Sequence, residues 1–206
     1  MKLSFERKLT QLTAKFIRCI SKFWLDYDPR ETHLIPIGPM LVVARHTSYL
    51  DGILLGAYFL KFQTLSPLAT AGLFRFPTDI ILRGANAIPV RRGQPFHLQT
   101  IKMALQRLQS GSVLIFPEGG VRVPYSKSPL KAGFVLLALK SGVPIIFCHL
   151  ENASVALAPG RLFVRRKKVS FKILKVIQSG DHGYPQCAGS AEREKCLQIA
   201  INEYGF

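Results

Sequence analysis

The chain has 206 residues, 48% of them hydrophobic, and its mean hydropathy is slightly positive at +0.19. This length and apolar content are typical of one ordinary domain with a buried core, and they exclude wholesale disorder. The chain has 28 Lys and Arg residues against 12 Asp and Glu residues, a formal net charge of +16. Such a field attracts nucleic acid, anionic lipid or phosphorylated substrates, and the high apolar content beside it favours a lipid surface.

Neither a membrane-spanning helix nor a disulfide framework is predicted. No stretch reaches the ~18 consecutive apolar residues that a spanning helix needs, and the nearest, residues 134–150, contains Lys140, Gly142 and Pro144. No signal peptide of the usual shape is visible. The four cysteines show neither a C-x-x-C pair nor the spacing of metal ligands, which fits a reducing compartment.

Residues 3–25 are predicted to form one amphipathic helix, because large apolar side chains recur there at steps of three and four. The apolar stripe consists of Phe5, Leu9, Leu12, Phe16, Ile20 and Phe23, widened by Ile17 and Trp24, and the other side carries Arg7, Lys8, Gln11, Lys15, Arg18 and Lys22. Aromatic residues opposite a cationic face suit a helix that lies in a membrane interface. A helix packed on the protein's own core is the alternative, and the two can coexist. We therefore divide the chain into a membrane-associating helix, residues 1–27, and a main domain, residues 28–206.

Beyond the break at Asp28-Pro29, short apolar segments alternate with helical ones. Strands are predicted at residues 40–44, 87–90, 113–116, 143–150, 162–164 and 169–177, and helices at 52–60, 98–108, 131–140 and 191–204. This alternation predicts an α/β fold with a single mixed, largely parallel sheet flanked by helices.

Polar residues follow three of the predicted strands. His46 and Asp51 follow the first, two arginines at 91–92 follow the second, and Glu118 follows the third. The carboxyl ends of strands are where α/β folds place chemistry. If residues 46–51 form a turn, the Asp51 carboxylate can accept a hydrogen bond from Nδ1–H of His46 and leave Nε2 free as a base. Taken singly, each feature also fits an ordinary surface pair or strand-ending turn.

The chain lacks the sequence signatures of several common enzyme classes. The chain contains no G-x-x-x-x-G-K-[ST] or G-x-G-x-x-G segment, so a nucleotide-binding loop is not predicted. It contains no G-x-S-x-G segment either, which argues against a hydrolase with a serine nucleophile.

Four ordered blocks between residues 38 and 150 resemble the glycerolipid acyltransferase family, typified by lysophosphatidic acid acyltransferases. The first block reads R-H-T-S-Y-L-D, in which His46, Ser48 and Asp51 match the family and Arg45 replaces a frequent Asn. The second, I-P-V-R-R, has Arg92 in the family's phosphate-contacting place.

The third block, F-P-E-G-G-V-R, is the main departure from the family's F-P-E-G-T-R-S. Glu118 and Gly119 match, Gly120 and Val121 stand where the family has Thr and Arg, and Arg122 comes one step late. The spacing from Glu118 to Lys131 is that of the family. The fourth block is the Val-Pro pair at 143–144 in an apolar strand.

The resemblance implies transfer of a fatty acyl group from acyl-CoA or acyl-carrier protein to a hydroxyl of lysophosphatidate or a related glycerophospholipid precursor. It implies that His46 is the base and that Asp51 orients it. The residues implied to bind substrate are Arg92, Glu118, Gly119, Arg122, Lys131 and Ser48. This chemistry needs no metal and no resident cofactor.

We expect the partners to be an anionic membrane surface, contacted through residues 3–25, the acyl thioester donor and the lysophospholipid acceptor. The expected location is a peripheral or monotopic one at the cytoplasmic face of a membrane. The alternatives are a non-catalytic lipid-binding protein and an acyltransferase with a different lipid acceptor. No nucleic-acid partner is expected, because the aromatics lie mostly in apolar stripes rather than among basic residues. The one dense basic cluster, residues 165–168, equally suits lipid headgroups.

Overall fold

The computed structural model describes residues 2–27, 34–91, 97–121, 130–181, 184–185 and 189–202. Within them a six-stranded sheet has the order β3-β2-β4-β1-β5-β6. The strands are β1 (Leu41–Ala44), β2 (Leu65–Thr70), β3 (Ile88–Val90), β4 (Ser112–Ile115), β5 (Ile145–Glu151) and β6 (Ser170–Ile177). All neighbouring pairs are parallel except β5 with β6, which is antiparallel. The predicted mixed, largely parallel sheet is therefore confirmed.

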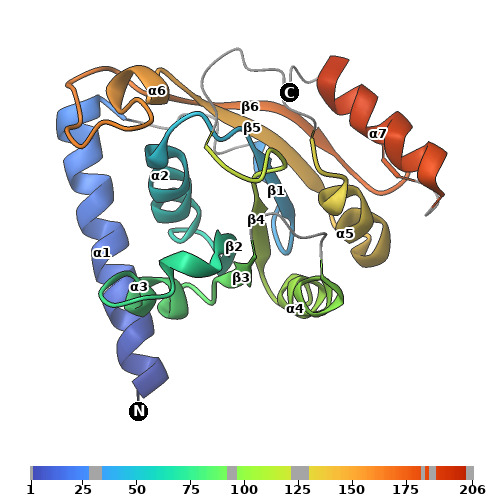
Figure 1. Ribbon diagram of the computed structural model, residues 1–206, viewed down its shortest axis with the longest axis horizontal. Helices are drawn as coiled ribbons and strands as arrows, with labels where there is room; N and C mark the ends of the chain where they lie inside the picture. Colours follow the sequence, from blue (N-terminus) through green and yellow to red (C-terminus); the bar gives the residue numbers. More distant parts are fainter. Residues whose placement is uncertain are drawn as a thin grey trace.

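Helices cover both faces of this sheet (Figure 1). On one side lie α1 (Lys2–Leu25), α2 (Tyr49–Phe59), α3 (Thr78–Gly84) and α6 (Ala153–Ala156), and on the other lie α4 (Leu98–Leu108), α5 (Gly133–Ser141) and α7 (Ser190–Asn202). A short 3-10 turn, η2 (Ala71–Leu73), follows β2.

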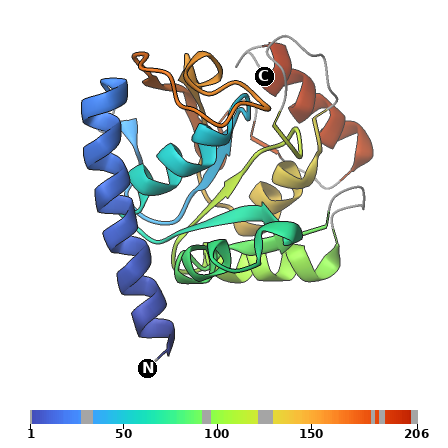
Figure 2. The same ribbon diagram turned by 60° about the vertical axis from the view of Figure 1, so that its left-hand side comes forward.

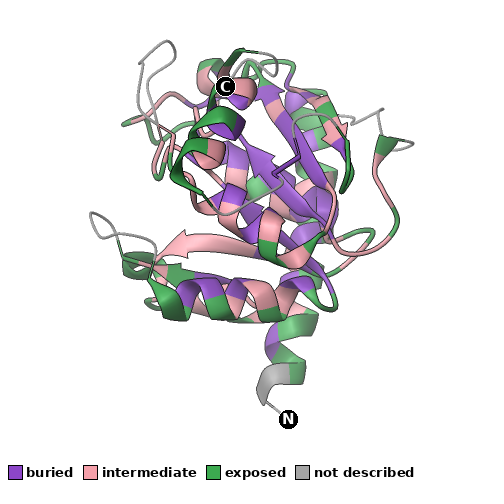
Figure 3. Cartoon of the chain, turned by 90° about the vertical axis from the view of Figure 1, so that its right-hand side faces the viewer, coloured by how far each residue is buried: buried purple, intermediate pink, exposed green. Residues whose placement is uncertain are grey.

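The layers follow from the apolar character of the central strands. Every residue of β1 and β4 is buried, as Figure 3 shows for the middle of the sheet. Successive side chains of β1 enter opposite cores: Val42 packs with α2, and Val43 packs with α4 and α5. Strands buried on both faces are expected of a parallel sheet enclosed by helices.

The structure corrects one predicted strand, and it contains elements that were not predicted, among them β2, α3 and α6. Residues 162–164 are not a strand, because the chain from 161 to 169 has no regular structure. The apolar side chains at 162 and 163 are exposed and not packed on the sheet. Conversely, β2 was not predicted, because Pro67 and the polar residues of L-S-P-L-A-T do not read as a strand. The predicted helix at 191–204 is α7, and its last residues lie outside the described part of the chain.

Helix α1 lies along the outside of the α2–α3 layer (Figure 2). It packs on the protein through a face of small and polar residues: a Cβ added at Gly84 of α3 would lie 2.0 Å from Oγ1 of Thr10 and 2.3 Å from the carbonyl oxygen of Glu6. Thr10 Oγ1 also donates a hydrogen bond of 3.1 Å to the carbonyl of Ile81, and Arg18 donates one to the carbonyl of Ala57.

Most of the large apolar residues of α1 point away from this packed face, whereas Ile17 and Leu25 pack on the core. Phe5, Leu12, Phe16, Ile20, Phe23 and Trp24 are all exposed. The alternative of a helix packed on the protein's own domain is therefore confirmed, while contact of the exposed stripe with a membrane stays a prediction. The division at residue 27 stays a prediction. In the described part of the chain, no helix combines the length and the apolar character that crossing a bilayer requires.

Candidate active site

The site begins where β1 and β4 end, and the register of these two strands brings its residues together. They pair in parallel from Leu41 with Val113 to Val43 with Ile115. Continued past the strand ends, the same offset of 72 residues places His46 beside Glu118. Oε1 of Glu118 accepts a hydrogen bond of 3.1 Å from the backbone N–H of His46. The two turns are therefore joined through a carboxylate.

Ser48 and Asp51 form a capping box at the start of α2. Oγ of Ser48 accepts a hydrogen bond of 3.1 Å from the N–H of Leu50 and donates one of 2.7 Å to the carbonyl of Leu157. Oδ2 of Asp51 accepts bonds of 2.7 Å and 2.8 Å from the N–H groups of Thr47 and Ser48. These contacts satisfy amide groups that a helix start leaves unpaired, and the N-terminal end of the helix dipole favours the carboxylate there.

The same carboxylate oxygen faces the imidazole of His46. Nδ1 of His46 lies 3.4 Å from Oδ2 of Asp51, in the turn geometry that the sequence predicted. Phe116 stacks on a face of the imidazole ring, with 4.1 Å between the ring centroids and 22° between the ring planes. The Asp51 side chain is 1% exposed and that of His46 is 18% exposed. The ring is thus oriented by an acceptor at Nδ1 and an aromatic face, and Nε2 is the nitrogen left for proton transfer.

Burial raises the pKa of the Glu118 carboxyl above its ordinary value, and hydrogen bonds from its own backbone N–H and from that of His46 partly offset this. A buried carboxylate is stabilised by such charge-assisted bonds but loses its hydration.

The backbone of the turn after Glu118 favours glycine. Gly119 has a φ of +72°, in the left-handed region that favours glycine. A Cβ there would also lie 2.7 Å from Nζ of Lys131. The Lys131 N–H donates a 2.8 Å bond to the carbonyl of Pro117, so the start of the α5 segment is tied to this turn. Lys131 therefore lies across the Glu118 turn.

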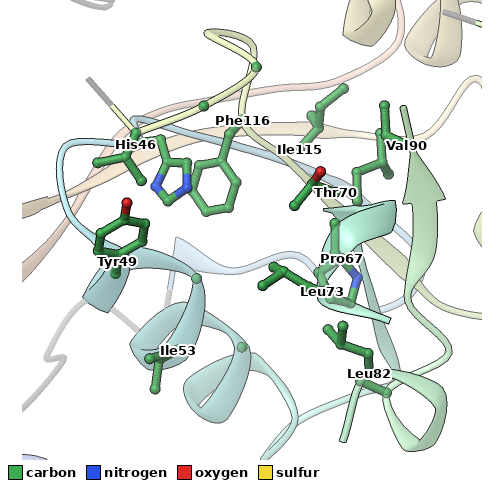
Figure 4. A pocket seen from close by; sticks show the side chains of 18 of the residues that line it. His46, Tyr49, Ile53, Pro67, Thr70, Leu73, Leu82, Val90, Ile115 and Phe116 are labelled. Atoms are coloured by element: carbon green, nitrogen blue, oxygen red, sulfur yellow. The ribbon is translucent and has the colours of Figure 1, made fainter. Parts of the chain in front are cut away.

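A cavity of about 1050 Å³ opens beside His46 and Phe116 (Figure 4). It extends from these two residues to Leu82 and Val90, and α1, α2, β2 and α3 supply most of its apolar wall. The basic residues that line it are Arg91, Lys131 and Arg193 of α7.

The predicted site residues fall into three groups. His46, Gly119 and Lys131 line the cavity, and Asp51 and Glu118 lie directly behind His46. Ser48 is fully buried and its hydroxyl bonds to backbone groups, which gives it a structural role as the cap of α2, and its predicted contact with substrate stays a prediction. Two predicted positions, Arg92 and Arg122, lie outside the described residues.

Several cavity residues were not predicted. The spacing of Tyr49, Ile53 and Gly56 along one helix face could have indicated that α2 lines a site. No sequence signal pointed to Arg193, which lies beyond the four blocks, or to the stacking of Phe116 on His46.

The class of protein that these features define is that of the acyltransferases. Residues 28–150, more than half of the chain, match the family model described as acyltransferase, and the chain belongs to this family.

The chain is also similar in sequence to proteins of known name. The 1-acyl-sn-glycerol-3-phosphate acyltransferase of Limnanthes alba is 29% identical over 152 residues, which cover 68% of this chain and 51% of that protein. The N-acylphosphatidylethanolamine synthase of Arabidopsis thaliana is 36% identical over 134 residues, which cover 59% of this chain and 46% of that protein. The chain thus spans about half the length of the curated relatives it matches.

A solved structure shows the same fold. The crystal structure of the 1-acyl-sn-glycerophosphate acyltransferase PlsC from Thermotoga maritima aligns with a TM-score of 0.72 and 22% identity, over 97% of this chain and 80% of that one. The mixed sheet and the N-terminal helix therefore belong to an established architecture.

We expect Glu118→Gln to stabilise the folded protein at neutral and alkaline pH. A group whose pKa is raised on folding stabilises the protein below its unfolded pKa, ordinarily 4.5 here, and this stability is lost as pH rises through the folded pKa. Glutamine keeps an acceptor for the His46 N–H and removes the buried charge. Urea unfolding at about pH 8 should show a higher midpoint for the variant than for wild type, and the difference should vanish near pH 4.5. A difference that does not change with pH would contradict the assigned cause.

Proposed function

We propose that this domain transfers a fatty acyl group from a thioester donor, acyl-CoA or acyl-carrier protein, to a hydroxyl of lysophosphatidate or a related precursor in phospholipid biosynthesis. The observation that carries the proposal is His46, with Nδ1 3.4 Å from Oδ2 of Asp51, at the wall of a large apolar cavity. The relatives of Limnanthes alba and Limnanthes douglasii, both named 1-acyl-sn-glycerol-3-phosphate acyltransferase, support the same reaction.

In the proposed mechanism Nε2 of His46 takes the proton of the acceptor hydroxyl as that oxygen attacks the thioester carbonyl. The carbon–sulfur bond then breaks, and the proton passes to the departing thiolate. Asp51 stabilises the imidazolium that forms between these steps. A thioester is already reactive, so the mechanism requires no acyl-enzyme intermediate.

The cavity suits the acyl chain of the donor or the acceptor. Its volume lies at the upper end of the ~300–1,000 Å³ of small-molecule sites. Tyr49, Ile53 and Gly56 form its α2 wall, and Ile17 of α1 and Leu82 of α3 contribute to the rest. Removing an alkyl chain from water into such a lining stabilises the complex by about 0.8 kcal/mol per CH₂ group.

The phosphate of the acceptor would meet basic residues of the cavity wall. Lys131 and Arg91 line the cavity, and Val121, which stands where the family has an arginine, also lines it. Positive charge near the reacting atoms favours the oxyanion and an anionic substrate. The predicted contacts of Arg92, Glu118 and Arg122 with substrate remain part of this proposal.

The exposed apolar stripe of α1 supports a peripheral or monotopic location at the cytoplasmic face of an anionic membrane. The stripe runs beside exposed Lys8, Lys15 and Lys22, as an interfacial helix requires. The acceptor and the product reside in that bilayer, so this location places the cavity next to its substrates.

A second acceptor is favoured by one observation. The Arabidopsis relative, named an N-acylphosphatidylethanolamine synthase, is more similar over its aligned region than the Limnanthes proteins are. The alternative reaction is acyl transfer to the amine of phosphatidylethanolamine, with the same base and the same cavity.

The first test of the proposed function compares the full chain with His46→Ala on vesicles that contain a labelled long-chain acyl-CoA donor and either lysophosphatidate or phosphatidylethanolamine. We expect acylated lysophosphatidate from wild type and at least about a 100-fold lower rate from the variant, because general base catalysis contributes 10²–10⁴. His97→Ala, at the exposed start of α4, is the matched control and should retain the wild-type rate.

Three other outcomes decide against parts of the proposal. Product from phosphatidylethanolamine alone would assign the second acceptor. Equal rates for wild type and His46→Ala would contradict the role of His46. No product with either acceptor, using acyl-CoA or acyl-carrier protein donors, would favour a non-catalytic lipid-binding protein.

The second test concerns chain length. Gly56 lies seven residues beyond Tyr49 on the cavity face of α2, about 10 Å further along the helix axis. Apart from the adjacent helix backbone, no atom lies within 4 Å of a Cβ built there. Gly56→Leu should therefore narrow the cavity at that depth. We expect the rate with long-chain donors to fall about tenfold or more while short-chain donors are used as before. Gly56→Ala should have a much smaller effect, and an equal loss for all chain lengths would contradict the assigned path.

A further inference from the structure

Residues 158–168, here called the 158–168 loop, lie between α6 and β6 and carry two highly exposed large apolar side chains. Leu162 is 90% exposed and Phe163 is 84% exposed. The described elements of the domain leave both side chains uncovered. Packing in the domain's own core does not account for these two adjacent apolar residues, because their neighbour Val164 packs against the core and they do not.

The loop is attached to the carboxyl end of α1. Nε1 of Trp24 donates a 3.4 Å hydrogen bond to the carbonyl of Val164, and the N–H of Val169 donates one of 2.9 Å to the carbonyl of Leu25. Nζ of Lys168 lies 3.4 Å from a carboxylate oxygen of Asp26. Figures 1 and 2 both show this segment beside the upper end of α1. The apolar tip is therefore positioned next to the exposed stripe of α1.

Phe23, 86% exposed, is the nearest end of that stripe along the helix. It directly precedes Trp24 and Leu25, which bond to the loop segment, so an aromatic group from α1 and the loop lie at one end of the molecule.

The charge of the loop matches an anionic surface. Its five charged residues are Arg161, Arg165, Arg166, Lys167 and Lys168, all of them basic and all exposed. An apolar tip that enters the acyl region, with cations beside it at headgroup level, is the arrangement of interfacial membrane anchors. Basic residues near an anionic leaflet strengthen such binding.

We propose that the 158–168 loop is a second membrane-contact element, in which Leu162 and Phe163 enter an anionic phospholipid bilayer and Arg165–Lys167 lie among its phosphates. This inference rests on the proposed membrane location and adds to it. A single interfacial helix can roll about its own axis, whereas two contacts beside each other determine which face of the domain meets the bilayer. The loop thereby sets the direction in which the His46 cavity opens relative to the lipid.

Other occupants fit this surface less well. A second copy of the chain, at a net charge of +16, would be repelled from a basic loop. A nucleic acid would pair with the arginines but would leave Leu162 and Phe163 exposed to water.

The depth of insertion tests the proposal. Trp24 is the single tryptophan of the chain. The full chain with Trp24→Phe and Phe163→Trp is mixed with vesicles of phosphatidylglycerol and phosphatidylcholine that carry bromine on their acyl chains. We expect a blue-shifted emission and quenching by the brominated chains. Leu98→Trp in the Trp24→Phe background, at a site on α4 in the other helix layer that is 76% exposed, is the matched control and should not be quenched.

Binding strength gives an independent readout. Leu162→Ala with Phe163→Ala, and separately Arg166→Gln with Lys167→Gln, should weaken partitioning onto these vesicles by about tenfold or more. The charge-matched control, Lys102→Gln with Lys140→Gln on α4 and α5, should change it by less than about twofold. Circular dichroism checks that each variant is folded.

The outcomes separate this inference from the proposed function. Quenching of Trp24 in the wild-type chain without quenching at position 163 would overturn the loop's role and leave docking through α1 standing. Absence of quenching at both positions would overturn both. Binding to a duplex oligonucleotide that depends on Arg166 and Lys167, with no quenching at position 163, would reassign the basic residues to nucleic acid and overturn the proposal.

Discussion

One carboxylate oxygen, Oδ2 of Asp51, determines the geometry on which the site depends. It accepts hydrogen bonds from the amides of Thr47 and Ser48, which begins α2, and it faces Nδ1 of His46. The start of the helix and the direction of the imidazole are therefore one arrangement. Because the Asp51 side chain is 1% exposed, these donors replace the water that its charge would otherwise bind. Loss of this oxygen would remove one half of the capping box of α2 and release His46 together.

The sheet supplies the second half of the site through β4. Its continuation carries Phe116, which stacks on His46, and Glu118, which accepts the His46 N–H. The ring and the backbone of His46 are thus both held by the segment that follows β4, which pairs with β1. Lys131 lies across the same turn, close to Gly119. This topology places His46 at the edge of a cavity walled by α1, α2 and α3. In the proposed membrane location, the outward stripe of α1 and the adjoining loop would orient that cavity toward lipid.

The sequence allowed the sheet, most helices and the pairing of His46 with Asp51 to be predicted, because buried parallel strands are short apolar runs and polar residues at their ends stand out. It did not reveal β2, whose Pro67 breaks the strand pattern. It also predicted a strand at 162–164, where the apolar residues belong to an exposed loop. An apolar stripe does not say which side of a helix is covered: α1 packs through small residues against Gly84, a contact that no periodicity reports. Burial of Ser48 likewise depends on Leu157, more than a hundred positions away.

The most direct test of the central claim is the tautomer of His46 in the full chain, read from ¹⁵N–¹H correlation spectra and assigned by comparison with a His46→Gln variant. The account predicts that the neutral ring carries its proton on Nδ1, facing Asp51, and that this preference is lost in Asp51→Asn together with most of the acyl-transfer rate. A proton on Nε2 in the wild-type protein would contradict it, because that nitrogen could not then accept the proton of an attacking hydroxyl.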